Sequence, residues 1–435
     1  INMGNLYRYI AIFSCFLLFS CESGNKKQQE PIKNLKRFQL LSAKETGVFF
    51  NNQLSVSEQA EYFNYQYAIN GSGLSLGDVN NDGLVDLYFV ANARSNKLYI
   101  NKGNMQFEDV TEQAGLLEEE GNWAVGSTMI DINNDGFLDI YVCMAGGKDV
   151  NSRKNLLYIN NGDLTFTESA TIFGIGDEGH SNQAVFFDYD LDDDLDLMVI
   201  NHSGNWNERR PYKELDKRGV FSDKLFRNNG DETFTDVSEE AGLEKDRYGF
   251  GLGVSVGDLN GDRYPDMYVA NDYFGADYLY FNNGDGTFSE KVKEATKHIS
   301  YFSMGTDIAD YNNDGLLDIV TVDMVAEDNY RQKTNMAGMN PTIFYEAVDA
   351  GLHYQYMFNA LHMNNGNESF SDVAQLAGMP NTDWSWAPIF ADFDSDGWKD
   401  LFITNGFARD LRDKDTNIKL QKEGKIGKDK NGNTV

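Results

Sequence analysis

A nine-residue pattern, Asp-x-Asn/Asp-x-Asp-Gly-x-x-Asp, recurs six times along this chain of 435 residues. Oxygen-bearing side chains at positions 1, 3, 5 and 9 of a tight loop, with the backbone carbonyl of position 7, form a cage of hard ligands. Such a cage suits calcium better than zinc or copper. One copy could be an ordinary turn, because Asp, Asn and Gly are common in turns. Six copies in register predict six calcium-binding loops, named here the first to sixth acidic loops.

The expected ligands are the residues at positions 1, 3, 5, 7 and 9 of each loop. They are Asp78, Asn80, Asp82, Leu84, Asp86; Asp131, Asn133, Asp135, Phe137, Asp139; Asp188, Asp190, Asp192, Asp194, Asp196; Asp258, Asn260, Asp262, Tyr264, Asp266; Asp310, Asn312, Asp314, Leu316, Asp318; and Asp392, Asp394, Asp396, Trp398, Asp400. Glycine at position 6 permits the sharp turn. The third and fourth loops have Asp193 and Arg263 there, so they match the pattern least well.

These loops differ from EF-hand loops, which need Glu at position 12 and a helix on each side. Position 12 is Phe89 in the first loop and Val142 in the second, each within a strand-like apolar run. The residues before each loop are strand-like as well. Each acidic loop is therefore expected to be the turn of a β-hairpin.

A second motif follows each of the first five loops: an apolar pair, then Asn-x-Gly, then Phe and a further strand-like run. The motif spans Leu98–Gly103, Leu157–Gly162, Leu225–Gly230, Leu279–Gly284 and Leu361–Gly366. Asn-Gly between two strand-like runs is a strong hairpin signal. Each repeat is then two hairpins, which predicts an all-β fold, a β-propeller of four-stranded blades. The recurring Gly-His and Trp-Asp pairs of WD40 propellers are missing.

Both motifs resemble the FG-GAP/VCBS repeats, whose calcium loops also occur in integrin α-chain propellers. From about Phe38 to Arg412 the chain is similar to bacterial VCBS-repeat lipoproteins related to cartilage acidic protein. The resemblance implies a propeller of seven blades, of which six begin in this chain. It also implies calcium in the hairpin that joins the first two strands of each blade, and further domains downstream.

The ends of the chain suggest export and truncation. Residues 1–20 form an expected signal peptide, because the apolar run is too short to span a bilayer. Cys21 follows a lipobox-like sequence and is the expected lipidation site, although an ordinary signal peptide with a chance cysteine is the alternative. Residues 21–36 then form a tether and 37–410 the propeller. Residues 411–435 form a truncated insertion or a disordered tail, with little order expected after about Asp410.

These features place the chain as an exported bacterial lipoprotein at the outer membrane, the cell surface or the periplasmic face. Phe38–Gly47 mimics the end of a repeat, so an N-terminal outer strand is expected to close the last blade. The sixth repeat is incomplete, which indicates an N-terminal part of a longer protein.

The net charge is −31, and much of it resides in the acidic loops. A chain without a basic stripe is a poor partner for nucleic acid or anionic lipid. Contact with a membrane is therefore expected only through the lipid anchor. With Cys21 lipidated, Cys143 has no partner for a disulfide after the signal peptide is cleaved. Bound calcium is therefore expected to stabilise the fold in place of disulfides.

Insertions collect on one face of the predicted ring. The distance from each Asn-x-Gly turn to the next acidic loop is nearly constant, at 26 to 28 residues. The distance from each acidic loop to the following turn varies from 17 to 48 residues. All length variation thus lies between the second and third strands, on the face opposite the acidic loops, and such a face usually binds ligands. The longest insertion contains a predicted short helix, 341–350.

Candidate ligand contacts on this variable face are an aromatic column at the start of the innermost strands, together with residues of the insertion after Asn201. They are Trp123, His180, Trp206, Arg209, Phe250, Phe302 and Trp384. The alternative is that these aromatics only plug the channel mouth. Two Gly-x-Ser-x-Gly stretches, at Ser75 and Ser255, imitate a hydrolase elbow but lie inside strands, so no catalytic residue is expected.

The leading interpretation is a surface-anchored, calcium-stabilised and non-enzymatic propeller that binds a glycan or an extracellular protein. A polysaccharide-active enzyme of the lyase type is the first alternative. A structural arm for missing downstream domains is the second. Fold alone does not decide among the three.

Overall fold

The computed structural model describes residues 38–55, 67, 71–117, 121–146, 153–202, 221–244, 249–273, 275–335, 339–406 and 413–424. The chain forms two compact units, residues 1–41 and 42–435. Of the first unit only residues 38–41 are described, and they carry no helix or strand. The expected signal peptide, Cys21, Trp206 and Arg209 lie outside the described residues. Every described helix and strand belongs to the second unit.

The second unit repeats one building block, an antiparallel sheet whose four strands lie side by side in chain order. Five such sheets are complete and are named blades 1 to 5. Blade 1 is β1 (Leu74–Gly77), β2 (Asp86–Phe89), β3 (Lys97–Asn101) and β4 (Phe107–Asp109); blade 2 is β5 (Ala124–Ile130), β6 (Asp139–Met144), β7 (Leu156–Asn160) and β8 (Phe166–Glu168); blade 3 is β9 (Ser181–Phe187), β10 (Asp196–Asn201), β11 (Lys224–Asn228) and β12 (Phe234–Asp236).

The remaining strands complete this pattern. Blade 4 is β13 (Gly251–Gly257), β14 (Asp266–Asn271), β15 (Tyr278–Asn282) and β16 (Phe288–Glu290); blade 5 is β18 (Gly305–Ala309), β19 (Asp318–Val322), β21 (Ala360–Asn364) and β22 (Phe370–Asp372). The sixth sheet pairs β23 (Ser385–Ala391) with β24 (Asp400–Asn405), and a parallel pair joins β17 (Ile299–Ser300) to β20 (Gln355–Tyr356).

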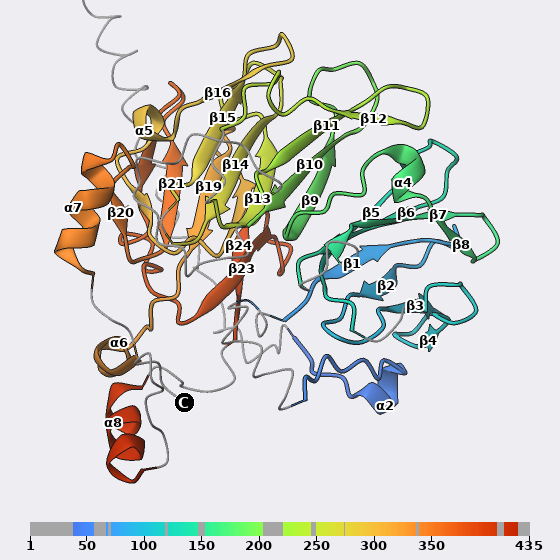
Figure 1. The fold of residues 1–435 in the computed structure, drawn as a ribbon, viewed down its shortest axis with the longest axis horizontal. Helices are drawn as coiled ribbons and strands as arrows, with labels where there is room; N and C mark the ends of the chain where they lie inside the picture. Colours follow the sequence, from blue (N-terminus) through green and yellow to red (C-terminus); the bar gives the residue numbers. More distant parts are fainter. Residues whose placement is uncertain are drawn as a thin grey trace, which may run out of the picture. The chain divides into compact units, whose positions relative to one another are not determined.

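The first strands of successive sheets are neighbours in space: β1 contacts β5, β5 contacts β9, and the series continues through β13 and β18 to β23. Figure 1 shows the sheets following one another in this order, with these first strands innermost. The fold is therefore an all-β propeller of four-stranded blades, with six blades begun in this chain. This confirms the fold predicted from the two hairpin motifs.

The apolar core lies between the blades. One cluster joins Tyr88 and Leu98 of blade 1 to Ile140 and Val142 of blade 2. Every residue of the second strands β6, β10, β14 and β19 is buried, because neighbouring blades cover both faces of these strands. In the sixth sheet β24 has no buried residue, and among the described residues β23 is its only partner.

Six helices are described, and all are short: α2 (Ala43–Thr46), α4 (Ala170–Phe173), α5 (Val292–Ala295), α6 (Asn329–Asn335), α7 (Pro341–Asp349) and α8 (Lys414–Lys422). Helix α7 confirms the predicted helix in the long insertion. Its start is set by Asn340, whose side chain accepts a hydrogen bond from the Thr342 N–H, and by Pro at the first helical position. None of the helices described is long and apolar enough to cross a membrane.

Two expectations about the chain ends need correction. Within residues 411–435, expected as a truncated insertion or disordered tail, the described residues 413–424 contain α8, which Asp413 caps by accepting the Thr416 N–H at 2.8 Å. Near the start, residues 42–47 form a capped turn of helix, α2, and residues 38–41 carry no strand. Gly47 nevertheless lies against the Phe107 carbonyl of blade 1, as Gly174 lies against the Phe234 carbonyl of blade 3. Residues 42–47 therefore contact blade 1 in the way that the end of one repeat contacts the following blade.

Candidate metal loops and ligand face

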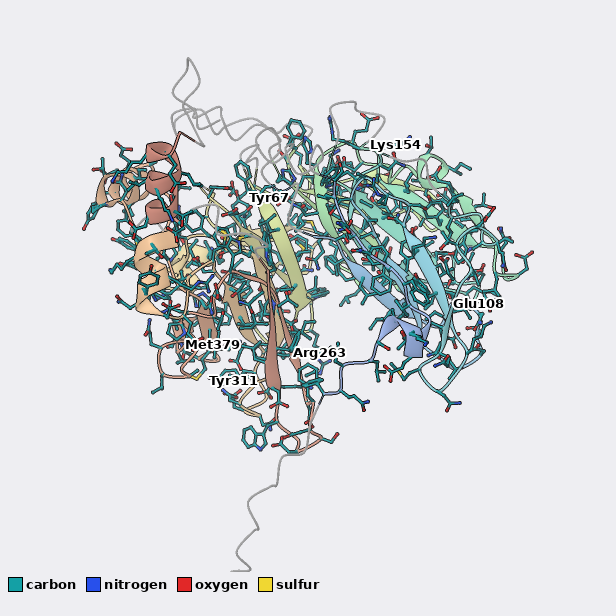
Figure 2. All side chains as sticks on the ribbon, turned by 90° about the horizontal axis from the view of Figure 1, so that it is seen from below. Tyr67, Glu108, Lys154, Arg263, Tyr311 and Met379 are labelled. Atoms are coloured by element: carbon teal, nitrogen blue, oxygen red, sulfur yellow. The ribbon has the colours of Figure 1, made fainter. Side chains whose placement is uncertain are left out.

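The acidic loops connect the first and second strands of blades 1 to 5 and of the sixth sheet, as predicted. Figure 2 shows Arg263 and Tyr311, from two of these loops, toward one end of the innermost strands, and Tyr67 near the other end. The variable connections leave the second strands at that other end. The two faces inferred from loop spacing are thus the two ends of the strands.

Each acidic loop is shaped by its own carboxylates. In the first loop Asp78 Oδ1 accepts the N–H of Asp82 at 3.1 Å, and its Oδ2 accepts the N–H of Gly83 at 2.7 Å. The N–H of Leu84 donates to Asp82 Oδ1 at 2.9 Å. The same three bonds recur in the other five loops, so the six loops share one backbone conformation.

The third and fourth loops adopt this conformation without glycine at position 6. Asp193 has φ 73° and Arg263 has φ 78°, close to the 84° of Gly83. A residue with a Cβ is strained in this left-handed region. The hydrogen bonds to Asp188 and Asp258 therefore hold these two residues in a conformation that glycine would adopt more easily.

The position-9 aspartates serve as structural anchors, a role not evident from the loop pattern. Asp139 is fully buried; its Oδ2 accepts the N–H of Ile132 at 3.1 Å and its Oδ1 accepts the N–H of Asn160 at 2.8 Å. The corresponding pair of bonds forms at Asp86, Asp196, Asp266 and Asp318. One carboxylate thus joins the acidic loop to the Asn-x-Gly turn of the same blade.

Burial and neighbouring negative charge raise the pKa of these anchors. Burial is the largest cause, and it raises the pKa of Asp196 and Asp266 to about 7 and that of Asp139 and Asp318 to about 6. Backbone N–H donors oppose the shift, and other carboxylates of the same loop add to it. A cation placed among these groups would favour their ionised form.

The donor set fits a hard divalent cation. Carboxylate oxygens of Asp188, Asp190 and Asp196 lie within 4.8 Å of one another, and so do those of Asp392, Asp394 and Asp400. Asp190 Oδ1 is buried and accepts no hydrogen bond within the described residues, so it remains available as a ligand atom. The third loop, which matches the sequence pattern poorly, is one of the two loops with this cluster. When bound, such an ion would hold the loop carboxylates together by charge.

In blades 2, 4 and 5 the asparagine of the Asn-x-Gly turn also bonds to the preceding blade. In blade 4, Asn282 Nδ2 donates to the Tyr189 carbonyl of blade 3 at 2.7 Å, and its Oδ1 accepts the Gly284 N–H at 2.9 Å. Asn160 and Asn364 make the same contact with the acidic loop of the preceding blade. The motif predicts the turn correctly, but its cross-blade bond is visible only in the structure.

A further column of Asn or Asp, missed in the sequence, stands directly before the third strand of each blade: Asn96, Asn155, Asp223, Asp277 and Asn359. In each, Oδ1 accepts a backbone N–H at or just after the end of the second strand, at 2.7 to 2.8 Å. The second polar atom can reach the next blade, as when Asn155 Nδ2 donates to Ser181 Oγ at 2.9 Å. The column could have been found, because each member precedes the Asn of an Asn-x-Gly turn by five residues.

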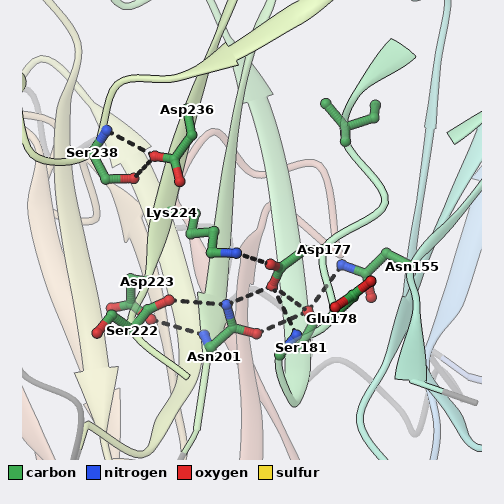
Figure 3. Close-up of polar contacts among 12 residues, drawn as sticks. Asn155, Asp177, Glu178, Ser181, Asn201, Ser222, Asp223, Lys224, Asp236 and Ser238 are labelled. Carbon is green, nitrogen blue, oxygen red and sulfur yellow. Dashed lines mark hydrogen bonds and ion pairs between the residues drawn. The ribbon is translucent and has the colours of Figure 1, made fainter. Parts of the chain in front are cut away.

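Figure 3 shows this contact between blades 2 and 3, where it widens into a network. Asp177 pairs with Lys224 and accepts the Asn201 Nδ2–H at 2.9 Å. Ser181 Oγ donates to Asn201 Oδ1 at 2.8 Å. These buried groups satisfy one another, which indicates a structural lock between blades.

The two serines that imitate a hydrolase elbow join adjacent innermost strands. Ser75 Oγ lies 2.5 Å from Ser127 Oγ, and Ser255 Oγ donates to the Thr306 carbonyl at 3.0 Å. The innermost strands surround a cavity of about 660 Å³, which these residues help to line. The hydroxyls are thus engaged in contacts between blades.

The aromatic column on the variable face is largely packed. Trp123, His180 and Phe250 are buried, and Phe302 and Trp384 are half-buried. His180 stacks on His202 at 5.0 Å between ring centroids, and His202 contacts Phe250 at 6.4 Å. Burial and a cationic neighbour lower the pKa of His180 to about 4. Binding by this column stays a prediction.

Exposed aromatic side chains lie instead on the longest insertion, between β19 and β21. We name as the ring cluster Phe344, Tyr345, Tyr354, Tyr356, Phe358 and His298. Phe344 contacts Tyr345, Tyr354 and Tyr356 at centroid distances of 5.2, 6.1 and 5.4 Å. Tyr345 is 61% exposed and Tyr354 45% exposed. Solvent thus reaches the part of the cluster carried by α7 and the segment before β20.

Four regions of the chain match the FG-GAP-like repeat: residues 63–142, 218–269, 258–321 and 351–403. Together they cover more than half of the chain. The chain belongs to the FG-GAP-like repeat family. Each region contains at least one acidic loop, which confirms the resemblance drawn from the two motifs.

Relatives of this chain include cartilage acidic protein 1 of Homo sapiens, 25% identical over 67% of this chain, and of Xenopus tropicalis, 27% identical over 77%. Each alignment covers 48% of the relative, so the chain spans about half the length of the curated relatives it matches. A solved lectin of Agrocybe aegerita that recognises non-reducing terminal N-acetylglucosamine aligns with a TM-score of 0.44 and 18% identity, over 75% of this chain and 73% of the lectin. A gluconolactonase of Xanthomonas campestris aligns with a TM-score of 0.39 and 8% identity, over 77% and 82%.

Proposed function

We propose that this chain is a calcium-stabilised, non-enzymatic binding module that holds a glycan on its variable face. The observation that carries the proposal is the ring cluster, which places exposed aromatic side chains on the longest connection of that face. Aromatic faces bury the apolar face of a sugar ring while the sugar hydroxyls stay hydrated. The expected binding residues are Tyr345 and Tyr354, with Phe344 and Tyr356 as support.

Calcium enters the proposal through the acidic loops. Their oxygen donors and clustered carboxylates suit this ion. The loops lie on the face opposite the ring cluster, so calcium is assigned a structural role. An extracellular protein is the second partner class, and the charge of −31 argues against nucleic acid. Display at the cell surface through a lipid on Cys21 belongs to the same proposal.

The test is retention of the full chain on immobilised polysaccharides, in calcium and in chelator, with assay of the same polysaccharides for new chain ends. We expect retention in calcium without cleavage, and at least a tenfold loss of affinity in a Tyr345→Ala/Tyr354→Ala double variant. Tyr330→Ala is the matched control, because Tyr330 is 69% exposed on α6 of the same insertion and lies outside the ring cluster.

Release of new chain ends would refute the non-enzymatic proposal in favour of a polysaccharide-active enzyme. Retention that survives the double variant would move the site away from the ring cluster. No retention on any polysaccharide would refute the glycan as ligand and leave a protein partner or a structural arm.

A further inference from the structure

Acidic loops of neighbouring blades are joined by an asparagine amide at two junctions. Asn81, at position 4 of the first loop, donates through Nδ2 to the Gly136 carbonyl of the second loop at 2.8 Å. Asn313, at position 4 of the fifth loop, donates to the Gly397 carbonyl of the sixth loop at 3.0 Å. Each bond connects a residue between two expected ligands of one loop to position 6 of the next.

The acceptor belongs to a peptide group that also holds a metal ligand. The Gly397 carbonyl and the Trp398 N–H are parts of one peptide group, and that N–H donates to Asp396 Oδ1 at 2.9 Å. In the second loop the Phe137 N–H likewise donates to Asp135 Oδ1 at 2.9 Å. Hydrogen bonds in series polarise one another. The amide of one loop therefore acts on the position-5 carboxylate of the next through a single peptide group.

We propose that Asn81 and Asn313 are positioning residues that couple neighbouring cation sites, the first to the second and the fifth to the sixth. The inference rests on the proposed binding of calcium in the acidic loops. A cation bound by Asn312 and Asp314 fixes the backbone of Asn313, which lies between them at φ 57°. The amide then orders the sixth loop in advance, so less ordering remains when the second cation binds. Coupling of this kind is reciprocal.

The other loops show where this coupling is missing. Position 4 is Leu191 in the third loop and Gly261 in the fourth, and neither side chain can donate a hydrogen bond. Asn134 in the second loop has the same amide and a φ of 55°, but within the described residues it makes no bond to the third loop. The structure therefore assigns two coupled pairs of sites and two sites that bind independently.

The test compares Asn313→Gly with Asn134→Gly in calcium titrations of the full chain by calorimetry. Glycine removes the amide and accepts a positive φ without strain, so both variants change the backbone equally. Loss of one hydrogen bond should weaken one or two sites of Asn313→Gly about fivefold and make the isotherm less steep. Asn134→Gly should match the unmodified chain. Equal isotherms for the two variants would overturn the coupling.

A second measurement needs no cation. Hydrogen exchange of residues 392–400 in chelator should be several-fold faster in Asn313→Gly than in Asn134→Gly, because the loop loses an external contact. Equal exchange in the two variants would overturn the positioning role. If the unmodified chain binds no calcium, the proposed function fails in its cation part and the coupling fails with it. If it binds calcium and Asn313→Gly binds identically, the coupling alone fails.

Discussion

At the scale of single residues, the acidic loops keep their conformation when position 6 is not the glycine of the sequence pattern. Arg263 and Asp193 occupy the position-6 site with φ above 70°, and the hydrogen bonds of each loop remain complete. The strained residue is held by the bond from its own N–H to the position-1 carboxylate. The cost of the missing glycine is therefore a matter of stability, and the loop conformation is unchanged.

Arg263→Gly should raise the free energy of unfolding by about 1 kcal/mol, because glycine has no Cβ penalty in the left-handed region. Arg263→Ala is the control, since it removes the same charge and keeps the Cβ. The measurement is thermal unfolding of the full chain in saturating calcium. An alanine variant as stable as the glycine variant would contradict the backbone explanation.

The column before the third strands consists of two aspartates and three asparagines, and all of them except Asp223 are buried. Asp277 accepts bonds from the Asn271 N–H, the Tyr268 hydroxyl and the Ser303 hydroxyl at 2.7 to 2.8 Å. Burial raises its pKa to about 7, and the negative charge of Asp323 adds to the rise. Asn155 makes the equivalent contacts with Tyr141 and Ser181. An asparagine at position 277 should therefore be able to make the same contacts with Tyr268 and Ser303.

The Asp277→Asn variant should have a free energy of unfolding that falls less as the pH rises. The folded protein retains the Asp277 proton to about pH 7, whereas the unfolded chain releases it near pH 4. Its contribution to stability therefore falls as pH rises from about 4 to about 7, by up to roughly 4 kcal/mol, and Asn has no proton to lose. Unfolding midpoints at pH 5 and pH 8 test this. A variant equally destabilised at both pH values would count against the raised pKa.

At the scale of strands and turns, each blade uses its two ends differently. At the acidic-loop end, a position-9 aspartate and an Asn-x-Gly asparagine join the loop, the turn and, at three junctions, the preceding blade. At the other end, the connection between the second and third strands differs in length from blade to blade. The column residue before the third strand bonds the far end of this connection to the end of the second strand.

Asn282→Ala should cost more stability than Asn228→Ala. Asn282 Nδ2 bonds to blade 3 through the Tyr189 carbonyl at 2.7 Å, whereas Asn228 Nδ2 donates within its own blade to the Leu195 carbonyl at 3.3 Å. Both variants lose the Asn-x-Gly turn bond, so the difference isolates the cross-blade bond at about 1 kcal/mol. Denaturant unfolding of the full chain measures it. Equal losses would show that the turn bond dominates.

At the scale of the whole molecule, the blades are held by apolar clusters at their junctions and by hydrogen bonds between innermost strands. Cys143 is buried and unpaired, so it contributes no crosslink, and burial raises the pKa of its thiol. The acidic loops meanwhile gather carboxylates at one end of the strands. Without a counter-ion their mutual repulsion opposes folding.

Removal of calcium should lower the stability of the entire propeller. A site with a dissociation constant of ~10⁻⁴ M in ~1 mM calcium contributes about 1.4 kcal/mol, so several sites together match the stability of an ordinary domain. Thermal unfolding in calcium and in chelator tests this, with magnesium as the control cation. An unfolding midpoint that does not move in chelator would refute the stabilisation of the propeller by calcium.

Much of this organisation was predictable from residue spacing. The acidic loops predict hairpins because their flanks alternate as strands do, and the Asn-x-Gly motif predicts the second hairpin of each blade. The face with insertions was also inferred correctly, since strand direction alternates. The order in residues 413–424 was missed, because the Asp413 cap stands in a stretch rich in charge with little apolar periodicity.

The repeat, the four-stranded blade and the set of loop carboxylates follow from the amino-acid sequence alone, because they depend on contacts between residues near one another in the chain. Which side chains join one blade to the next is set by tertiary packing. Ser75, Asn81, Asn282 and Asn313 each bond to a residue more than 50 positions away. Local spacing carries no record of such pairings, because the partner is chosen by the packing of whole blades.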